Sequence, residues 1–148
     1  MKRVLIAAIV AAALVIPNTA QAYVRPQGPC TAKSYWITRD MSLATRRYKA
    51  KRLIVCVFNH IDPAQTQEAL YIAGRESGFD PFAYNVSGAE GLFQHMQAYW
   101  CSRVNTYLTK SEFPNQYPSV SPFRARANAF VTARMVRAQG WGAWSTYP

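Results

Sequence analysis

Acidic side chains are scarce in this sequence. Its 148 residues include 7 Asp and Glu against 17 Lys and Arg, which gives a formal net charge of +10. A charge of this size predicts an anionic partner, and envelope polymers, acidic phospholipids and nucleic acids all qualify. The charge does not distinguish between these partners, but the chain contains no nucleic-acid-binding motif, so we do not predict a nucleic-acid partner.

Long apolar runs are absent after the N-terminus. A basic start precedes an apolar run over Val4–Ile16, and the sequence then reaches an A-x-A end at Ala22. This order is typical of a secretory signal peptide, and the run is too short for a membrane span. We predict a signal peptide over residues 1–22, cleaved near Ala22, and a product in the periplasm or outside the cell. That location favours an anionic envelope polymer over nucleic acid as the partner.

Cysteine is rare as well. Cys30, Cys56 and Cys101 all lie in the predicted exported part, where two of them would pair in an oxidising compartment. Their spacing contains no C-x-x-C pair, so we predict no metal site, and neither His60 nor His95 has the context of a Cys–His nucleophile pair. We favour a Cys56–Cys101 disulfide, because these residues lie on the predicted helices that flank the central segment described next.

Residues 23–148 show no internal repeat, low-complexity tract or second domain, and this length is sufficient for one packed core. Apolar residues at helical spacing predict helices over about 42–60 and 95–108, and a last helix that Ser121-Pro122 begins and Gly140 ends. The β-branched run at Ile54-Val55 leaves a short strand as an alternative within the first of these.

The central segment begins with a further helix. Asp62 is a typical N-cap, Gln65 would complete a capping box, and Gly78 marks the helix end. One face of this helix carries Ala69, Ile72, Ala73 and Glu76. A carboxyl group at the end of an apolar stripe is partly shielded from water, and such a group can hold the proton that a general acid needs. The alternative is that Glu76 reaches solvent at the helix end.

A glycine-rich turn follows the helix. Gly88 and Gly91 bracket small residues, which permits a tight turn and a close approach of the backbone to a ligand. Gln94 comes next, with an amide that can both donate and accept hydrogen bonds. Asp80, between the helix and this turn, is predicted to form a turn of its own.

Two motifs resemble the catalytic core of soluble-type lytic transglycosylases, relatives of goose-type lysozyme that cleave bacterial peptidoglycan. They are Glu76-Ser77-Gly78-Phe79-Asp80-Pro81-x-Ala83 and Ser87-Gly88-Ala89-x-Gly91-Leu92-Phe93-Gln94. The resemblance covers about residues 62–138, because residues 122–128 are similar to the family's lead into the helix behind the catalytic one. It implies a mainly α (α+β), lysozyme-like fold, a helical bundle with a short β-like flap over residues 79–94 that lines the glycan cleft.

The resemblance also implies roles for individual residues. Glu76 would act as catalytic acid and then as base, without a metal or another cofactor. One carboxylate suffices when the N-acetyl group of muramic acid assists bond cleavage and the sugar's own C6 hydroxyl then attacks, which leaves a 1,6-anhydro end. Ser77 and Gln94 would position the sugar, and the backbone of Gly88–Gly91 would shape the subsites. The substrate-binding candidates are Ser77, Tyr84, Ser87, Gly88, Gly91 and Gln94.

Some positions depart from the family pattern. Phe93 stands where methionine is usual, and Glu90 occupies a variable slot, where we predict an exposed turn residue. Ala83-Tyr84-Asn85 repeats the letters of a downstream family motif at the wrong place, so that motif's role is not transferred. The C-terminal aromatic residues Trp141, Trp144 and Tyr147 could stack on sugars or close the core, and we favour the core.

The predicted function is therefore a secreted, monomeric lytic transglycosylase that cuts the β-1,4 bond between N-acetylmuramic acid and N-acetylglucosamine in peptidoglycan strands. The alternatives are a hydrolytic muramidase, a non-catalytic wall-binding protein on the same fold, and a basic membrane-active protein. The basic run Arg46–Arg52 could bind anionic cell-wall polymers or could be an ordinary solvated helix face.

Overall fold

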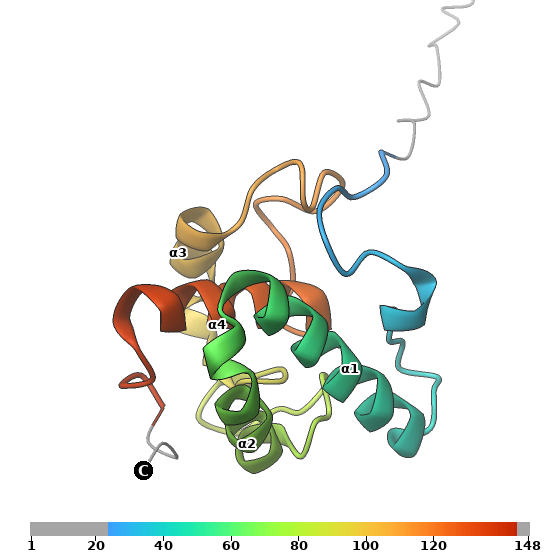
Figure 1. Cartoon of the computed structure of the whole chain (residues 1–148), viewed down its shortest axis with the longest axis vertical. Coiled ribbons are helices and arrows are strands. Elements are labelled where there is room, and N and C mark those ends of the chain that lie inside the picture. Colours follow the sequence, from blue (N-terminus) through green and yellow to red (C-terminus); the bar gives the residue numbers. More distant parts are fainter. Residues whose placement is uncertain (1–23, 145–148) are drawn as a thin grey trace, which may run out of the picture.

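Helices make up most of the computed structural model, which describes residues 24–144 (Figure 1). The α-helices are α1 (Leu43–Ile61), α2 (Thr66–Ser77), α3 (Gln97–Tyr107) and α4 (Ala125–Gln139). Two 3-10 helices, η1 (Lys33–Tyr35) and η2 (Pro63–Gln65), and the paired strands β1 (Ala89–Glu90) and β2 (His95–Met96) complete the elements. The mainly α, lysozyme-like fold is confirmed. The predicted signal peptide and Tyr147 lie outside the described residues.

The core forms where α1 and α4 pack together, with α2 on α1 and α3 on α4. Alanines on α4 let its neighbours approach closely, and Phe58, Phe93 and Phe130 fill the space between the elements. Full burial of such side chains contributes about 1.5–3 kcal/mol each. Within residues 24–144, none of the helices has both the length and the apolar character needed to cross a bilayer.

The helix ends agree only partly with the sequence signals. Gly78 ends α2 in the left-handed conformation (φ 58°), as predicted. The capping box is wrong, because Asp62 also closes α1 and its side chain makes no cap hydrogen bond. The Gln65 Oε1 atom instead accepts a hydrogen bond from Trp141 Nε1 (2.8 Å). The last helix begins at residue 125, and Ser121 instead accepts a bond from the Phe123 N–H in the turn before it.

The disulfide joins Cys30 to Cys56, with 6.0 Å between their Cα atoms. The predicted Cys56–Cys101 pair is wrong: Cys101 is a free, exposed thiol on α3, a helix that packs on α4. The N-terminal segment that holds Cys30 lies against α1 and brings this cysteine to Cys56. A crosslink over a loop of this size stabilises the fold by about 3 kcal/mol in the chain-entropy estimate.

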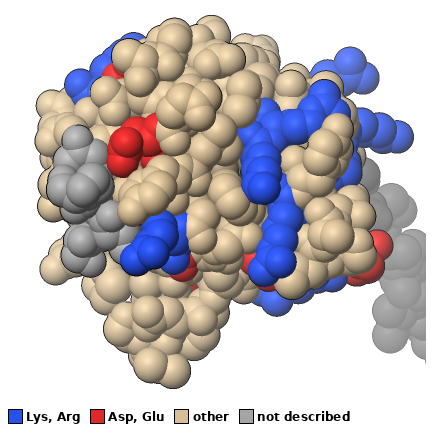
Figure 2. All heavy atoms as spheres, turned by 60° about the horizontal axis from the view of Figure 1, so that its bottom comes forward, with Lys and Arg blue, Asp and Glu red and all other residues tan. Residues whose placement is uncertain are grey.

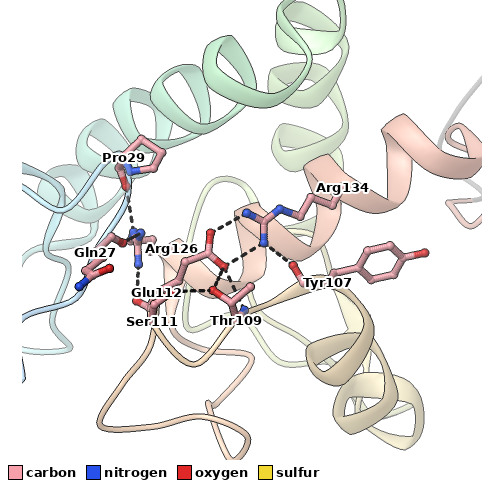
Figure 3. Close-up of polar contacts among 8 residues, drawn as sticks. All are labelled: Gln27, Pro29, Tyr107, Thr109, Ser111, Glu112, Arg126 and Arg134. Atoms are coloured by element: carbon pink, nitrogen blue, oxygen red, sulfur yellow. Dashed lines mark hydrogen bonds and ion pairs between the residues drawn. The ribbon is translucent and has the colours of Figure 1, made fainter.

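An ion-pair network ties the α3–α4 loop and the N-terminal segment to α4 (Figure 3). Arg134 forms a bidentate ion pair with the Glu112 carboxylate, with N–O distances of 2.5 and 3.0 Å. Arg126 donates hydrogen bonds to the carbonyl oxygens of Gln27, Pro29 and Glu112. Burial raises the pKa of Glu112, but bonds from Arg134 and Thr109 outweigh it and lower the pKa overall. Glu112 is therefore a structural carboxylate.

Candidate functional site

Glu76 lies in the last turn of α2, at the end of a buried stripe. Ala69, Ile72 and Ala73 are fully buried, which confirms the predicted apolar face of the helix. Glu76 continues that face and is partly buried. The helix stops two residues later because Gly78 adopts a positive φ, so the chain turns away immediately after this carboxyl group.

Ser77 joins the end of α2 to the glycine-rich turn. Its hydroxyl lies 3.1 Å from the Ala73 carbonyl oxygen and 2.8 Å from the Leu92 carbonyl oxygen, and it donates to them. This contact sets the distance between the helix that carries Glu76 and the turn. The structure thus gives Ser77 a positioning role through the backbone.

Side chains from α4 and the C-terminal segment hold the same turn from the other side. Asn128 is fully buried, and its Oδ1 accepts a hydrogen bond from the Phe93 N–H (3.0 Å). The Asn128 amide nitrogen donates to the carbonyl oxygens of Glu90 (3.3 Å) and Pro122 (2.9 Å). Trp144 donates its indole N–H to the Phe93 carbonyl oxygen (2.8 Å). We call residues 90–94, with these contacts, the clamped turn.

Gly91 is the residue that lets Asn128 come this close. It has a φ of +81°, and a Cβ placed on it would collide with the amide nitrogen of Asn128 and the Pro122 carbonyl oxygen. Both its backbone conformation and its lack of a side chain are therefore needed. Its N–H donates to the Ala83 carbonyl oxygen (2.9 Å), which joins the clamped turn to the segment before it.

Gln94 closes the clamped turn with its own side chain. Its φ is 49°, and its amide nitrogen donates to the carbonyl oxygens of Gly91 (2.9 Å) and Ala83 (3.2 Å). The amide nitrogen is thus occupied by the backbone. The amide oxygen Oε1 remains the atom of Gln94 that can accept a hydrogen bond from a ligand.

The other substrate-binding candidates lie on the tip of the loop before the clamped turn. Tyr84 is 62% exposed and Val86 is 98% exposed. Asn85 Oδ1 accepts hydrogen bonds from the backbone N–H and the hydroxyl of Ser87, both at 2.7 Å, and Gly88 follows with a φ of +89°. We call residues 84–88 the exposed tip. It presents an aromatic ring and a hydroxyl to solvent, and no atom lies within 4 Å of the place where a Cβ on Gly88 would be.

The other carboxylates near the site have different surroundings. Asp80 forms a bidentate ion pair with Arg46, with N–O distances of 3.0 and 3.1 Å. Its carboxylate also accepts a hydrogen bond from the Phe82 N–H, which confirms its turn-forming role. Glu90 is 8% exposed, so the prediction of an exposed turn residue is wrong. Glu90 is buried because its backbone pairs with neighbouring segments: it lies in β1 opposite His95 of β2, and it forms a β-bridge with Tyr84.

A chain of buried polar side chains lies behind the clamped turn, and no sequence motif predicts it. His95 Nδ1 lies 2.6 Å from Arg103 Nη1, and because arginine only donates, Nδ1 accepts and Nε2 carries the proton. Nε2 then donates to Thr132 Oγ1 (2.8 Å), and that hydroxyl donates to the Asn128 carbonyl oxygen (2.9 Å). Burial and then the charge of Arg103 lower the pKa of His95 to about 3, so the ring is neutral at neutral pH.

Trp141 and Trp144 are buried, and Trp141 stacks on Phe58 with ring centroids 6.0 Å apart, so the preference for a core role is confirmed for both. Among the described residues 24–144, no group of His, Cys, Asp or Glu is arranged to hold a metal ion.

Comparison with known families gives one match. Residues 60–113 match the family model of the transglycosylase SLT domain, a stretch that contains Glu76, the exposed tip and the clamped turn and covers less than half of the chain. The match supports a soluble lytic transglycosylase-type domain, from a family that cleaves peptidoglycan. Searches of curated proteins and of solved structures found no significant match.

Proposed function

We propose that this protein is a secreted lytic transglycosylase that cleaves the β-1,4 bond between N-acetylmuramic acid and N-acetylglucosamine, with Glu76 as acid and base. The observation that carries the proposal is the join between α2 and the clamped turn. Glu76 ends a buried stripe, and the next residue, Ser77, fixes the turn beside it through the Leu92 carbonyl oxygen. This arrangement holds the end of α2, which carries Glu76, at a fixed place beside the clamped turn, and general acid–base catalysis requires such a fixed group.

The reaction has two steps. In the first, Glu76 donates its proton to the glycosidic oxygen while the bond from this oxygen to C1 of muramic acid breaks and the N-acetyl oxygen bonds to C1. In the second, the Glu76 carboxylate takes the proton of the C6 hydroxyl as its oxygen attacks C1 and displaces the N-acetyl oxygen. The product has a 1,6-anhydro bridge, no water is consumed, and Glu76 is protonated again.

Two other carboxylates are already bound by arginines, which makes them poor candidates for a second catalytic group. Asp80 is bound by Arg46, and Glu112 is bound by Arg134 in the loop between α3 and α4. A hydrolase usually uses a second carboxylate to activate water, whereas a substrate-assisted reaction does not. The internal C6 hydroxyl also has an entropic advantage, since effective molarities of about 10⁵ M or more are reached by well-oriented internal nucleophiles.

Substrate contacts are assigned to the two parts of the loop. The Gln94 Oε1 atom can accept a hydrogen bond from a sugar hydroxyl, since the amide nitrogen already holds the turn. The ring of Tyr84 and the Ser87 hydroxyl can contact the strand from the exposed tip, and the absence of a side chain at Gly88 leaves space for it. The backbone of Gly91 would line the cleft without direct side-chain contact.

Export and partners follow from charge and disulfide chemistry. The signal-peptide pattern over residues 1–22 and the Cys30–Cys56 disulfide both favour an oxidising compartment outside the cytoplasm. The excess of basic residues favours anionic cell-wall polymers as additional partners. We propose a monomer that works without a cofactor.

Digestion of purified peptidoglycan tests the proposal. Glu76→Gln keeps the shape of the side chain but cannot transfer a proton, so we expect release of soluble fragments to fall by at least about 10²–10⁴-fold. Mass spectrometry of the native products should show new ends that are one water lighter than hydrolysed ends and resist borohydride reduction. More than a tenth of native activity in Glu76→Gln would refute the assignment.

Glu90→Gln is the matched control, because it makes the same change in the neighbouring loop. We expect it to keep most of the activity and the anhydro products. If Glu90→Gln is inactive and the native products are reducible, the protein is a muramidase with two carboxylates.

A further inference from the structure

The first half of α1 brings cations to the turn that ends α2. An Arg47 Nη2 atom lies 3.5 Å from the place where a Cβ on Gly78 would be, two residues after Glu76. The Lys51 ammonium lies 4.6 Å from the centre of the Phe79 ring. Figure 2, which turns the α2 end of the molecule toward the viewer, shows Lys and Arg gathered on one side of this face and few acidic residues.

The cations of the basic run differ in what they contact. Arg46 is occupied, because it binds the Asp80 carboxylate and the Arg39 and Met41 carbonyl oxygens. Arg47 and Lys51 are exposed, and both ion pairs found within residues 24–144 involve other residues. The negative end of the α2 dipole favours a cation at this position but leaves most guanidinium donors available. Arg47 and Lys51 therefore form a cationic edge beside the turn that ends α2.

We propose that Arg47 and Lys51 bind the free carboxylates of the peptides attached to muramic acid, so that the enzyme prefers strands with charged peptides. This inference rests on the proposed function and names a specificity of the same site. Carboxylates are the anions that arginine and lysine pair with most directly. In peptidoglycan each peptide is attached to muramic acid, the sugar whose C1 bond is cut, so its carboxylates enter the site with the scissile bond.

The position of the cationic edge favours the bound strand over a separate wall polymer as the source of the anion. Arg47 Nη2 lies close to Gly78, two residues after Glu76 in the chain, so a carboxylate bound by Arg47 lies beside the turn that ends α2. A separate phosphate-rich polymer held at this place would compete with the strand that must be cut. Binding of such a polymer to the cationic edge would then inhibit cleavage, whereas a carboxylate on the strand itself helps to bind and position that strand.

The test compares two preparations of the same peptidoglycan strands. One keeps its peptide carboxylates, and in the other they are converted to methylamides with carbodiimide and methylamine. We expect native protein to cleave the charged strands with a kcat/KM about three- to tenfold higher, and added salt to reduce this ratio. In the double variant Arg47→Gln/Lys51→Gln, the ratio should fall to near one, mainly through a higher KM on charged strands.

Lys110→Gln is the control, because Lys110 is an exposed cation in the loop that follows α3, and α3 lies away from α2 in Figure 1. It should keep the native ratio. A native ratio near one at low salt, or an unchanged ratio in the double variant, overturns the inference. Inhibition of native protein by free phosphate polymer, without any preference between the strands, also overturns it. Failure of native protein to cleave either preparation refutes the proposed function instead.

Discussion

The clamped turn and the exposed tip are neighbours in the sequence, but they are held in different ways. In the clamped turn, Ser77, Asn128 and Trp144 each bind backbone atoms of residues 90–93, and these side chains come from α2, α4 and the C-terminal segment. The exposed tip is held mainly by contacts within the loop, such as those of Asn85 with Ser87. Three distant parts of the chain thus fix one half of the loop.

The clamped turn and the exposed tip are suited to two different tasks, catalysis and substrate binding. Catalysis needs the wall beside Glu76 to stay in place, since small displacements of positioning groups reduce rates strongly. Substrate entry is easier if the outer part of the loop can adjust, and its few buried contacts give it little resistance to movement. We infer that the clamped turn determines stability and rate, whereas the exposed tip determines affinity.

Replacing the two glycines by alanine gives the largest expected contrast. Gly91 and Gly88 have similar φ values, +81° and +89°, so alanine is strained by about 1–2 kcal/mol at either position. At Gly91 the added Cβ also collides with Asn128 and Pro122, whereas at Gly88 no atom lies within 4 Å. We expect Gly91→Ala to lower the free energy of unfolding by about 2–5 kcal/mol in total, and Gly88→Ala by about 1–2 kcal/mol.

Urea unfolding followed by circular dichroism measures both changes. Equal losses of stability in Gly91→Ala and Gly88→Ala would show that backbone strain alone matters and that the clamp by Asn128 contributes little. Activity should fall with stability only for the change at Gly91.

Acid should weaken the clamped turn through His95. The ring is held neutral in the folded protein, with a pKa of about 3, while the unfolded chain binds a proton near pH 6.5. The unfolded state therefore binds more protons between these values, so stability falls as the pH drops through this window. The slope is at most about 1.4 kcal/mol per pH unit, and we expect a loss of about 2 kcal/mol from pH 7 to 5.

Denaturant unfolding of native protein and of His95→Gln at pH 7 and pH 5 measures this effect. His95→Gln should be less stable at pH 7 but should lose less stability on acidification. His60→Gln changes an exposed histidine at the end of α1 and should keep the native pH dependence. The same acid-induced loss in His95→Gln and native protein would place the responsible group elsewhere.

The sequence predicts those parts of the molecule that local rules determine. The helical spacing of Ile72 and Ala73 predicts that both lie in the core. Gly78 predicts the end of α2 because glycine adopts the left-handed conformation of a helix C-cap without strain. Burial of Trp141 and Trp144 follows from the size of their apolar rings. These features depend on few distant contacts, so the amino-acid pattern is sufficient.

The features that the sequence does not predict depend on contacts between distant parts of the chain. Cys56 pairs with Cys30 because the N-terminal segment lies against α1, and a strand pairing buries Glu90. Asn128 looks like one polar residue on an apolar helix, and only the folded chain shows it under the clamped turn. Two polar residues among the apolar positions of α4, Asn128 and Thr132, were the available signal.

Tyr84→Ala should have the smallest effect on stability, and it tests the division of tasks directly. Because Tyr84 is exposed and the change removes little buried surface, we expect the free energy of unfolding to change by less than about 0.5 kcal/mol. If the exposed tip binds the strand, KM on peptidoglycan fragments should rise about three- to tenfold, while kcat stays near the native value. Tyr71→Ala is the control, since Tyr71 is an exposed tyrosine on α2 outside the loop, and it should leave both constants near native values. A fall in kcat without a change in KM for Tyr84→Ala would place the tip in the catalytic step, because a residue that only binds the strand affects ground state and transition state alike.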